Sequence, residues 1–418
     1  MVTLLHDTFF RRARNACVQS FHAADDLVSR LRRPARRVLF EAASPLSLAV
    51  FKPVLERLQC DSRVEFWFTT DDSSWNADQT FGRAGIVDRI VTPADVRWMK
   101  FDGYVNTDFW NTTWLNRRCR RVHLFHGVAG KYGLDAPVHI APVVRSFDRI
   151  MFANQDRLQR YVEAGLVEGD GARAQLIGYP KADCLVDGSL NRCEIIHSLG
   201  LDPSRPTVLY APTWSAFSSL NSIGAHLLPA LASLNVNVIV KLHDRSFDPR
   251  SQSDSSVDWG RDFESICRAW GVHAVKDGDI ARYLYVADAL ITDHSSAGFE
   301  FMLLDRPIVV IDCPELIQNA RVAADKVQLL QNAAIVARHD AHAIADAVSR
   351  ALMDPTDKSA ERVDAARRVF YRPGTATARA VECIYNLLEL ETPAAVPASA
   401  PAVSAPAVLS SSRTSHHV

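Results

Sequence analysis

Short polar clusters suited to phosphate chemistry occur at five places in the sequence, each directly after an apolar run that predicts a strand. In open parallel sheets, ligands bind beyond the carboxyl ends of the strands, where helices begin. Two sheets that face one another across a cleft would therefore bring all five clusters together. The clusters are His126-Gly127, Gly178-Tyr179, residues 211–214, residues 241–243 and residues 293–296.

The stretch 288–312 predicts a strand, a hydroxyl-rich turn, a helix and a second strand. Small residues and free backbone N–H groups at a helix start suit a phosphate, because that end of the helix is electropositive. Ser295 and Ser296 supply hydroxyl donors, and Thr213 offers a third from another strand end. Asp293 either contacts the phosphate or orients the turn. We expect this turn to hold the diphosphate of an activated donor, although serine is also a common helix N-cap.

Two series of strand-like runs alternate with helix-length segments, which is typical of parallel βαβ units. The sequence therefore predicts an α/β protein with two Rossmann-like domains facing across a cleft, at 38–200 and 201–390, joined near residue 200. The first series comprises 38–40, 64–68, 104–106, 122–125, 150–153 and 175–177, and the second comprises 208–210, 236–242, 272–275, 289–292 and 308–311.

Composition excludes several classes of protein. A formal net charge of -1 gives no general attraction to nucleic acid, and eight cysteines without a C-x-x-C pair favour reduced thiols over a disulfide framework. We find no signal peptide and no apolar run long enough to span a bilayer, so we expect a cytoplasmic location. The Ala/Pro/Ser-rich tail, 391–418, is predicted to be disordered.

Residues 1–37 are basic, with eight arginines against three aspartates. Apolar residues recur at helical spacing within 14–33, which predicts an amphipathic helix. Such a helix either contacts anionic lipid on the inner face of the membrane or packs on the first domain with solvated arginines.

The motifs HLFHGVAGKYG (123–133), GYPKAD (178–183), VLYAPTWS (208–215), VIVKLHD (238–244) and ALITDHSSAGFEFMLLDRPIVV (289–310) resemble the CDP-glycerol glycerophosphotransferase family. Members build poly(polyol phosphate) chains of teichoic acids and some capsules on a glycosyltransferase-B fold. The resemblance implies a donor such as CDP-glycerol and an acceptor hydroxyl on a polyol phosphate, a lipid-linked group or a saccharide. It implies no cofactor and no obligatory metal.

The resemblance also implies roles for single residues. His126 would be the general base, since imidazole accepts a proton near neutral pH. His243 and Lys241 would bind the donor phosphates, with Asp244 favouring the protonated form of His243, and Glu300 would bond the nucleotide ribose. The family pattern at 126–131 is kept at Gly127 and Lys131, whereas Val128 and Ala129 replace its Thr-Pro. We expect four residues to line the cleft, namely Gly127, Lys131, Gly178 and Tyr179.

Two alternatives stay open from the sequence. One is a nucleotide-sugar glycosyltransferase or epimerase of the same fold, and the other is a nucleotide-binding protein without catalytic activity. Each candidate residue also has a structural interpretation, such as a loop histidine bonded to backbone or a glycine required by a turn.

Overall fold

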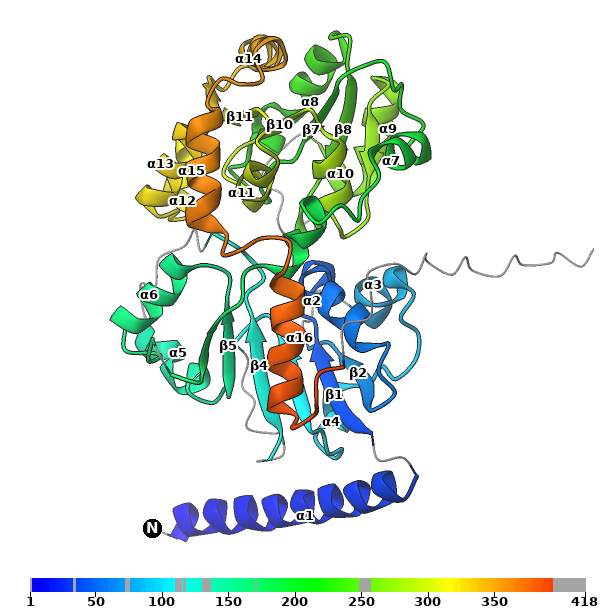
Figure 1. The fold of residues 1–418 in the computed structure, drawn as a ribbon, viewed down its shortest axis with the longest axis vertical. Helices are drawn as coiled ribbons and strands as arrows, with labels where there is room; N and C mark the ends of the chain where they lie inside the picture. Colours follow the sequence, from blue (N-terminus) through cyan, green and yellow to red (C-terminus); the bar gives the residue numbers. More distant parts are fainter. Residues whose placement is uncertain are drawn as a thin grey trace, which may run out of the picture.

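Two parallel six-stranded sheets, one in each half of the chain, organise the protein into a lower and an upper lobe (Figure 1). The structure is a computed structural model that describes residues 2–32, 35–71, 76–109, 115, 118–129, 137–169, 171–247 and 257–393. The predicted α/β fold with two Rossmann-like halves is confirmed.

The first sheet has the strand order β2-β1-β3-β4-β5-β6. Its strands are short and mostly buried; β3, for example, has no exposed residue. Helix α2 shows how the sequence fixes a helix start, because the Ser44 hydroxyl accepts a hydrogen bond from the Ser47 amide and Pro45 occupies the first turn. The strands are β1 (Arg36–Glu41), β2 (Val64–Thr69), β3 (Gly103–Asn106), β4 (Arg120–Leu124), β5 (Arg149–Phe152) and β6 (Ala174–Leu176); the helices are α2 (Pro45–Leu58), α3 (Ala77–Thr80), η1 (Gly82–Ala84), α4 (Pro93–Val96), α5 (Pro137–Val144), α6 (Gln155–Glu163) and η2 (Pro180–Leu185).

The second sheet has the order β12-β11-β10-β7-β8-β9. The sequence did not predict β12, which has three residues, one of them the exposed Val336. The strands are β7 (Thr207–Tyr210), β8 (Asn237–Lys241), β9 (His273–Val275), β10 (Ala289–Thr292), β11 (Ile308–Ile311) and β12 (Ile335–Ala337); the helices are α7 (Arg192–Ser198), α8 (Ser219–Ala232), η3 (Asp244–Phe247), α9 (Trp259–Ala269), α10 (Ala281–Val286), α11 (Ser296–Phe301), η5 (Met302–Leu304), α12 (Pro314–Asn319), α13 (Ala324–Asn332), α14 (Ala341–Met353) and α15 (Ser359–Val369).

The last helix, α16 (Ala376–Leu387), returns from the upper lobe and lies along the lower one (Figure 1). It packs on α2, and one buried apolar cluster includes residues of both sheets and of α16, among them Val38, Leu290 and Ile384. This shared core holds the two lobes together beside the cleft. The division into domains near residues 37, 200 and 390 stays a prediction.

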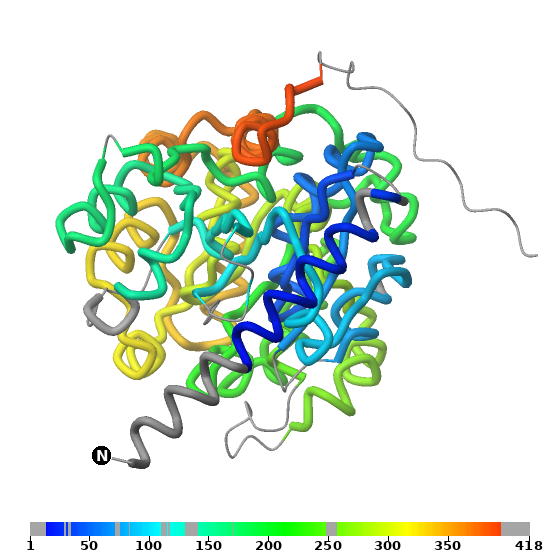
Figure 2. The backbone as a smooth tube through the Cα atoms, turned by 90° about the horizontal axis from the view of Figure 1, so that it is seen from below, coloured from blue at the N-terminus to red at the C-terminus, as the bar shows by residue number. Residues whose placement is uncertain are grey.

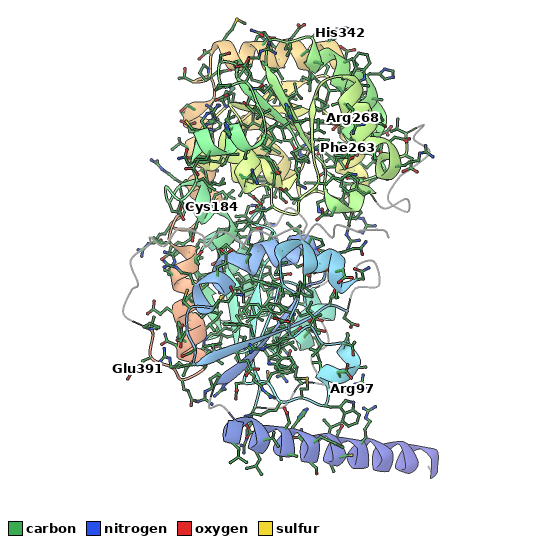
Figure 3. The ribbon with its side chains drawn as sticks, turned by 90° about the vertical axis from the view of Figure 1, so that its right-hand side faces the viewer. Arg97, Cys184, Phe263, Arg268, His342 and Glu391 are labelled. Carbon is green, nitrogen blue, oxygen red and sulfur yellow. The ribbon has the colours of Figure 1, made fainter. Side chains whose placement is uncertain are left out.

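Helix α1 (Val2–Arg32) crosses the underside of the lower lobe (Figures 1 and 2). Its buried His22 contacts the carbonyl of Arg97 through Nε2 at 2.8 Å, and Arg97 lies beside the helix in Figure 3. Asp25 accepts hydrogen bonds from the Arg37 guanidinium at 2.6 Å and the Lys100 amide at 2.9 Å. Among the residues described, no helix is long and apolar enough to cross a membrane. Most of the predicted tail, from residue 394, lies outside the described residues.

Candidate active site

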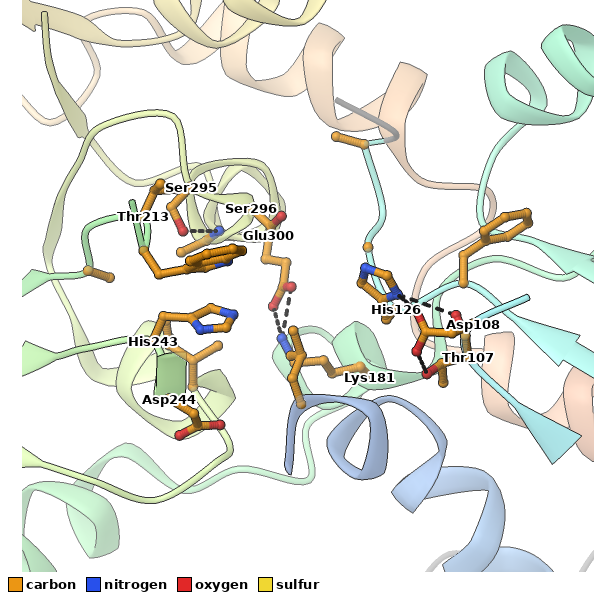
Figure 4. A pocket seen from close by; sticks show the side chains of 18 of the residues that line it. Thr107, Asp108, His126, Lys181, Thr213, His243, Asp244, Ser295, Ser296 and Glu300 are labelled. Atoms are coloured by element: carbon orange, nitrogen blue, oxygen red, sulfur yellow. Dashed lines mark hydrogen bonds and ion pairs between the residues drawn. The ribbon is translucent and has the colours of Figure 1, made fainter. Parts of the chain in front are cut away.

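A cavity of about 360 Å³ lies between the two lobes, with walls formed by the carboxyl ends of strands from both sheets (Figure 4). Its volume is that of a small-molecule site. The structure brings most of the predicted site residues to this one cavity. Those that line it are His126, Gly127, Thr213, Lys241, His243, Ser295, Ser296 and Glu300.

His126 follows β4 and points into the cavity from the lower lobe (Figure 4). Its Nδ1 lies 3.0 Å from a carboxylate oxygen of Asp108 and 3.3 Å from the carbonyl of Thr107. A carbonyl can only accept a hydrogen bond, as can an ionised carboxylate, so Nδ1 carries the hydrogen. The Nε2 of neutral His126 is therefore unprotonated, which is the form that can take a proton from an acceptor hydroxyl.

The same contacts set the charge of this histidine. The surrounding protein disfavours the imidazolium, but the hydrogen bond and negative charge of Asp108 outweigh that effect and raise the pKa of His126. Burial opposes ionisation of Asp108, yet His126 keeps the pKa of that carboxyl below its usual value. Asp108 therefore orients the ring and strengthens its basicity.

His243 faces His126 from the upper lobe with the opposite arrangement (Figure 4). Its Nδ1 accepts a hydrogen bond from the Arg245 amide at 3.1 Å, so in the neutral ring the hydrogen is on Nε2. The expectation that Asp244 favours a protonated His243 does not fit this bond, which needs an unprotonated Nδ1. His243 is thus arranged as a hydrogen-bond donor toward the cavity.

Lys241 ends β8, and its ammonium group donates to the Leu242 carbonyl at 2.7 Å. Burial lowers the pKa of Lys241, while the nearby Asp244 acts in the opposite direction. The hydroxyl-bearing Thr213 lies on the same side of the cavity (Figure 4). Together they place a cation and a hydroxyl donor on the upper lobe.

Asp293 does not line the cavity, because it is fully buried behind the turn. Its carboxylate accepts hydrogen bonds from the Thr213 amide at 2.7 Å, the Ser219 amide at 3.2 Å and the Ser219 hydroxyl at 3.0 Å. Of its two predicted roles, the structure therefore fits orientation of the turn and not contact with a phosphate.

Ser295 is the N-cap of α11, and its hydroxyl accepts from the Ala297 amide at 3.3 Å. Ser296 is the first residue of the helix, and both serines line the cavity. The Ser295 hydroxyl therefore caps the helix, which leaves the Ser296 hydroxyl as the candidate for binding a phosphate.

Glu300, predicted to bond a ribose, has a protein partner that the sequence did not reveal. Both of its oxygens accept from the Lys181 ammonium, at 2.8 and 2.7 Å, and both side chains are almost fully buried. Lys181 belongs to η2, so this ion pair links the lobes at the floor of the cavity (Figure 4). A ribose hydroxyl would have to share Glu300 with Lys181.

Gly178 and Tyr179 lie behind the wall of the cavity and do not line it. Gly178 has φ +91°, and a Cβ there would come within 2.5 Å of the Tyr371 carbonyl, so a glycine is required. The Tyr179 hydroxyl donates to the His126 carbonyl at 3.1 Å, which supports the base from below. Lys131, also predicted to line the cleft, lies outside the described residues.

The sequence interpretation missed Asp108, Arg157 and Lys181 as cavity residues, whereas Trp214 belongs to the predicted cluster 211–214. Asp108 had a usable signal, since it follows the predicted strand 104–106 as the other clusters follow theirs. Trp214 is partly exposed, and its ring centroid lies 6.0 Å from that of His243. In the part of the chain that the structure describes, no three His, Cys, Asp or Glu side chains are grouped so as to hold a metal ion.

Comparisons with known proteins give one consistent result. The sequence model described as CDP-Glycerol:Poly(glycerophosphate) glycerophosphotransferase matches residues 100–386. A teichoic acid glycerol-phosphate primase of Bacillus spizizenii is 28% identical over 170 residues, and this match covers 40% of each chain. The chain thus aligns with less than half of that relative.

Solved structures share the fold. The wall teichoic acid polymerase TagF superposes with a TM-score of 0.65 at 16% identity, covering 93% of this chain and 98% of the polymerase chain. A variant of TagF soaked with CDPG gives the same TM-score. A UDP co-structure of S. aureus MnaA has a TM-score of 0.52 at 10% identity, covering 85% of this chain and 98% of that one.

Proposed function

Since the chain belongs to the CDP-glycerol:poly(glycerophosphate) glycerophosphotransferase family, we propose that it transfers glycerol phosphate from CDP-glycerol to an acceptor hydroxyl and releases CMP. The family membership confirms the resemblance found in the motifs and shows that the protein is an enzyme of the glycerophosphotransferase family. What we propose beyond family membership is the identity of the donor, the acceptor and the polymer. TagF soaked with CDPG supports the choice of donor.

The observation that carries the proposal is the pair of histidines with opposite hydrogen placement on the two walls of one cavity. His126 presents an unprotonated Nε2 from the lower lobe, and His243 presents an Nε2–H from the upper lobe. A transfer between two oxygens needs both functions, because one oxygen loses a proton while the other gains negative charge.

In the proposed reaction, the acceptor hydroxyl gives its proton to Nε2 of His126 as its oxygen attacks the β-phosphorus of the donor. A bond forms between that oxygen and phosphorus, and the bond from phosphorus to the bridging oxygen breaks. CMP leaves with the bonding electrons. Lys241, His243 and the Thr213 hydroxyl stabilise the charge that develops on the leaving phosphate, and Ser296 binds the phosphate from the start of α11.

The test is CMP release from CDP-glycerol by purified protein, with glycerol-phosphate oligomers as acceptors. His126→Ala should lower the rate by about 10²–10⁴-fold, the usual contribution of a positioned base. Retention of most of the activity would refute the role of His126. Faster release of a uridine nucleotide from a uridine nucleotide sugar would instead favour the glycosyltransferase or epimerase alternative. The shared fold with MnaA is the reason to test it.

We also propose that α1 attaches the enzyme to the inner face of an anionic membrane. Asp25 and His22 fix one side of the helix to the lower lobe, and the Phe21 ring packs against Trp98 there. Leu27 and Leu31 are exposed, Leu31 by 79%. The basic composition of residues 1–37 suits lipids with negative head groups.

Co-sedimentation with vesicles measures this contact. Wild type should pellet with phosphatidylglycerol vesicles more than with phosphatidylcholine vesicles, and Leu27→Asp/Leu31→Asp should lose the difference. Val87→Asp is the matched control, since Val87 is 75% exposed elsewhere on the lower lobe. Equal pelleting of the double variant and wild type would exclude α1 as the attachment.

A further inference from the structure

Among the residues that the structure describes, four arginine and lysine side chains line the cavity, and two of them already have carboxylate partners within the protein. Lys181 is paired with Glu300. Arg160 lies 2.5 Å from Asp325 and 3.4 Å from Asp156. The other two, Arg157 and Lys241, form no ion pair with a carboxylate among the residues that the structure describes. One of these cations belongs to each lobe.

Arg157 is held in a defined position beside the proposed base. It lies in the first turn of α6, whose N-cap Asn154 accepts a hydrogen bond from the Arg157 amide. Its Nη1 donates to the Gly127 carbonyl at 2.6 Å, and its guanidinium carbon lies 4.4 Å from the centre of the Phe125 ring. Gly127 follows His126 in the chain, so the guanidinium and the base share one wall.

The charge of Arg157 persists in this position. Burial lowers the pKa of Arg157 to about 10, which still leaves the group protonated at neutral pH. Arg157 is partly buried, and a charge that is partly shielded from water is stabilised by an anionic partner. Within the described structure one of its five N–H groups donates to a protein acceptor, and a guanidinium fork matches two phosphate oxygens.

We infer that Arg157 binds a phosphate of the acceptor, so that the cleft has separate anion subsites on its two walls. Lys241, His243, Thr213 and Ser296 form the donor side on the upper lobe, whereas Arg157 lies on the side of the group that deprotonates the acceptor. The enzyme therefore prefers acceptors that carry a phosphate close to the reacting hydroxyl over neutral alcohols. This inference rests on the proposed transfer reaction and assigns to Arg157 the recognition of the phosphate-bearing acceptor that the family's description implies.

The first experiment compares glycerol 3-phosphate with glycerol as acceptors at saturating CDP-glycerol. Arg157→Met keeps an apolar stem against Phe125 and removes the charge. It should lower kcat/KM for glycerol 3-phosphate by about 10–100-fold, as expected for a lost charged hydrogen-bond pair. The value for glycerol should change by less than about 3-fold, and KM for CDP-glycerol should stay constant.

Arg306→Met is the matched control, because the Arg306 guanidinium also bonds backbone carbonyls, those of Tyr285 and Ala287, but lies outside the cavity. It should leave the ratio between the two acceptors unchanged. An equal loss with both acceptors in Arg157→Met would assign this arginine a structural role and overturn the inference. A raised KM for CDP-glycerol alone would assign it to the donor and overturn it as well.

A binding measurement separates this inference from the transfer reaction itself. Calorimetric titration of glycerol 3-phosphate into protein saturated with CDP should show weaker binding to Arg157→Met than to wild type and Arg306→Met. Equal affinities in folded variants, checked by circular dichroism, would overturn the anion subsite. Failure of wild type to release CMP with any acceptor would refute the proposed reaction, whatever the titration shows about Arg157.

Discussion

Removing the carboxylate of Asp108 should lower the pH at which the enzyme gains activity. A general base acts in its neutral form, so kcat/KM rises as the pH passes upward through the pKa of His126. Asp108 raises that pKa through a contact of 3.0 Å. Two unit charges at this separation attract by about 1.4 kcal/mol in a medium as polar as water. The water-like value applies because the His126 side chain is 53% exposed.

One pKa unit corresponds to about 1.4 kcal/mol, so Asp108→Ala should move the rising limb of the profile by roughly one pH unit toward acid. The pKa of His126 falls in this variant, because without the carboxylate the imidazolium loses its stabilisation and releases its proton at lower pH. The maximal rate should fall by less than about 10-fold, because the Thr107 carbonyl still accepts from Nδ1 and preserves the reactive tautomer. Asp108→Asn should lower the maximal rate further, by about 10²–10⁴-fold, because the asparagine amide can donate to Nδ1 of His126 and force the hydrogen onto Nε2.

The assay is CMP release from CDP-glycerol between about pH 5 and 9, combined with an NMR titration of His126 assigned through His126→Gln. Asp156→Ala controls for a general change in charge, because Asp156 lines the same cavity but bonds Lys326 instead of His126. In Asp156→Ala, the rising limb of the pH profile should stay at the wild-type pH even if the maximal rate changes. A profile and a titration midpoint that do not move in Asp108→Ala would refute the electrostatic role of Asp108.

Three further predictions concern stability and donor binding. Burial raises the pKa of Glu41 to about 7, so the folded state holds a proton that the unfolded state releases between about pH 4.5 and 7. The stability of the protein therefore falls as the pH rises through that range. Glu41→Gln should raise the free energy of unfolding, measured by urea denaturation, by about 3 kcal/mol at pH 8 and change it little at pH 5. Lys181→Met should destabilise the protein by about 3–5 kcal/mol because it leaves Glu300 buried and unpaired. The double variant with Glu300→Leu should recover most of that stability in the same assay. A double variant as unstable as Lys181→Met would argue against a mainly structural pair. Ser295→Ala should cost about 1 kcal/mol of stability as a lost N-cap, whereas Ser296→Ala should leave stability unchanged and weaken CDP binding measured by calorimetry; the reverse pattern would exchange the two roles.

The sequence was sufficient to predict the sheets because continuous apolar runs in parallel strands are a strong signal. Every predicted strand coincides with one of β1 to β11. The exception, β12, is a three-residue edge strand whose apolar residues, 335–337, the sequence interpretation did not assign to a strand. The path of α16 was not predictable in the same way. The contact of α16 with α2 joins residues far apart in the sequence, and it shows that the helix covers the lower lobe.

The position of the polar clusters after strand ends predicted where the cavity lies. It did not distinguish residues that face the cavity from residues behind its wall. Thr213 and Ser296 reach the cavity, while Asp293 and Tyr179 point into the protein and hold the wall in place. Asp293 and Ser296 are only three residues apart, yet the first is buried and the second lines the cavity. The pairing of Glu300 with Lys181 depends further on how closely the lobes approach, which no local pattern contains.

The roles of the two histidines are set by backbone groups that the sequence motifs do not describe. His126 and His243 are the same side chain at the same kind of position, the end of a parallel strand. At His126 the nearby backbone group is a carbonyl, that of Thr107, so Nδ1 is a donor and Nε2 is left as a base. At His243 it is the Arg245 amide, so Nδ1 is an acceptor and Nε2 becomes a donor. An acid–base pair can therefore be built from two identical residues, because the direction of each neighbouring peptide group selects the tautomer before any substrate binds.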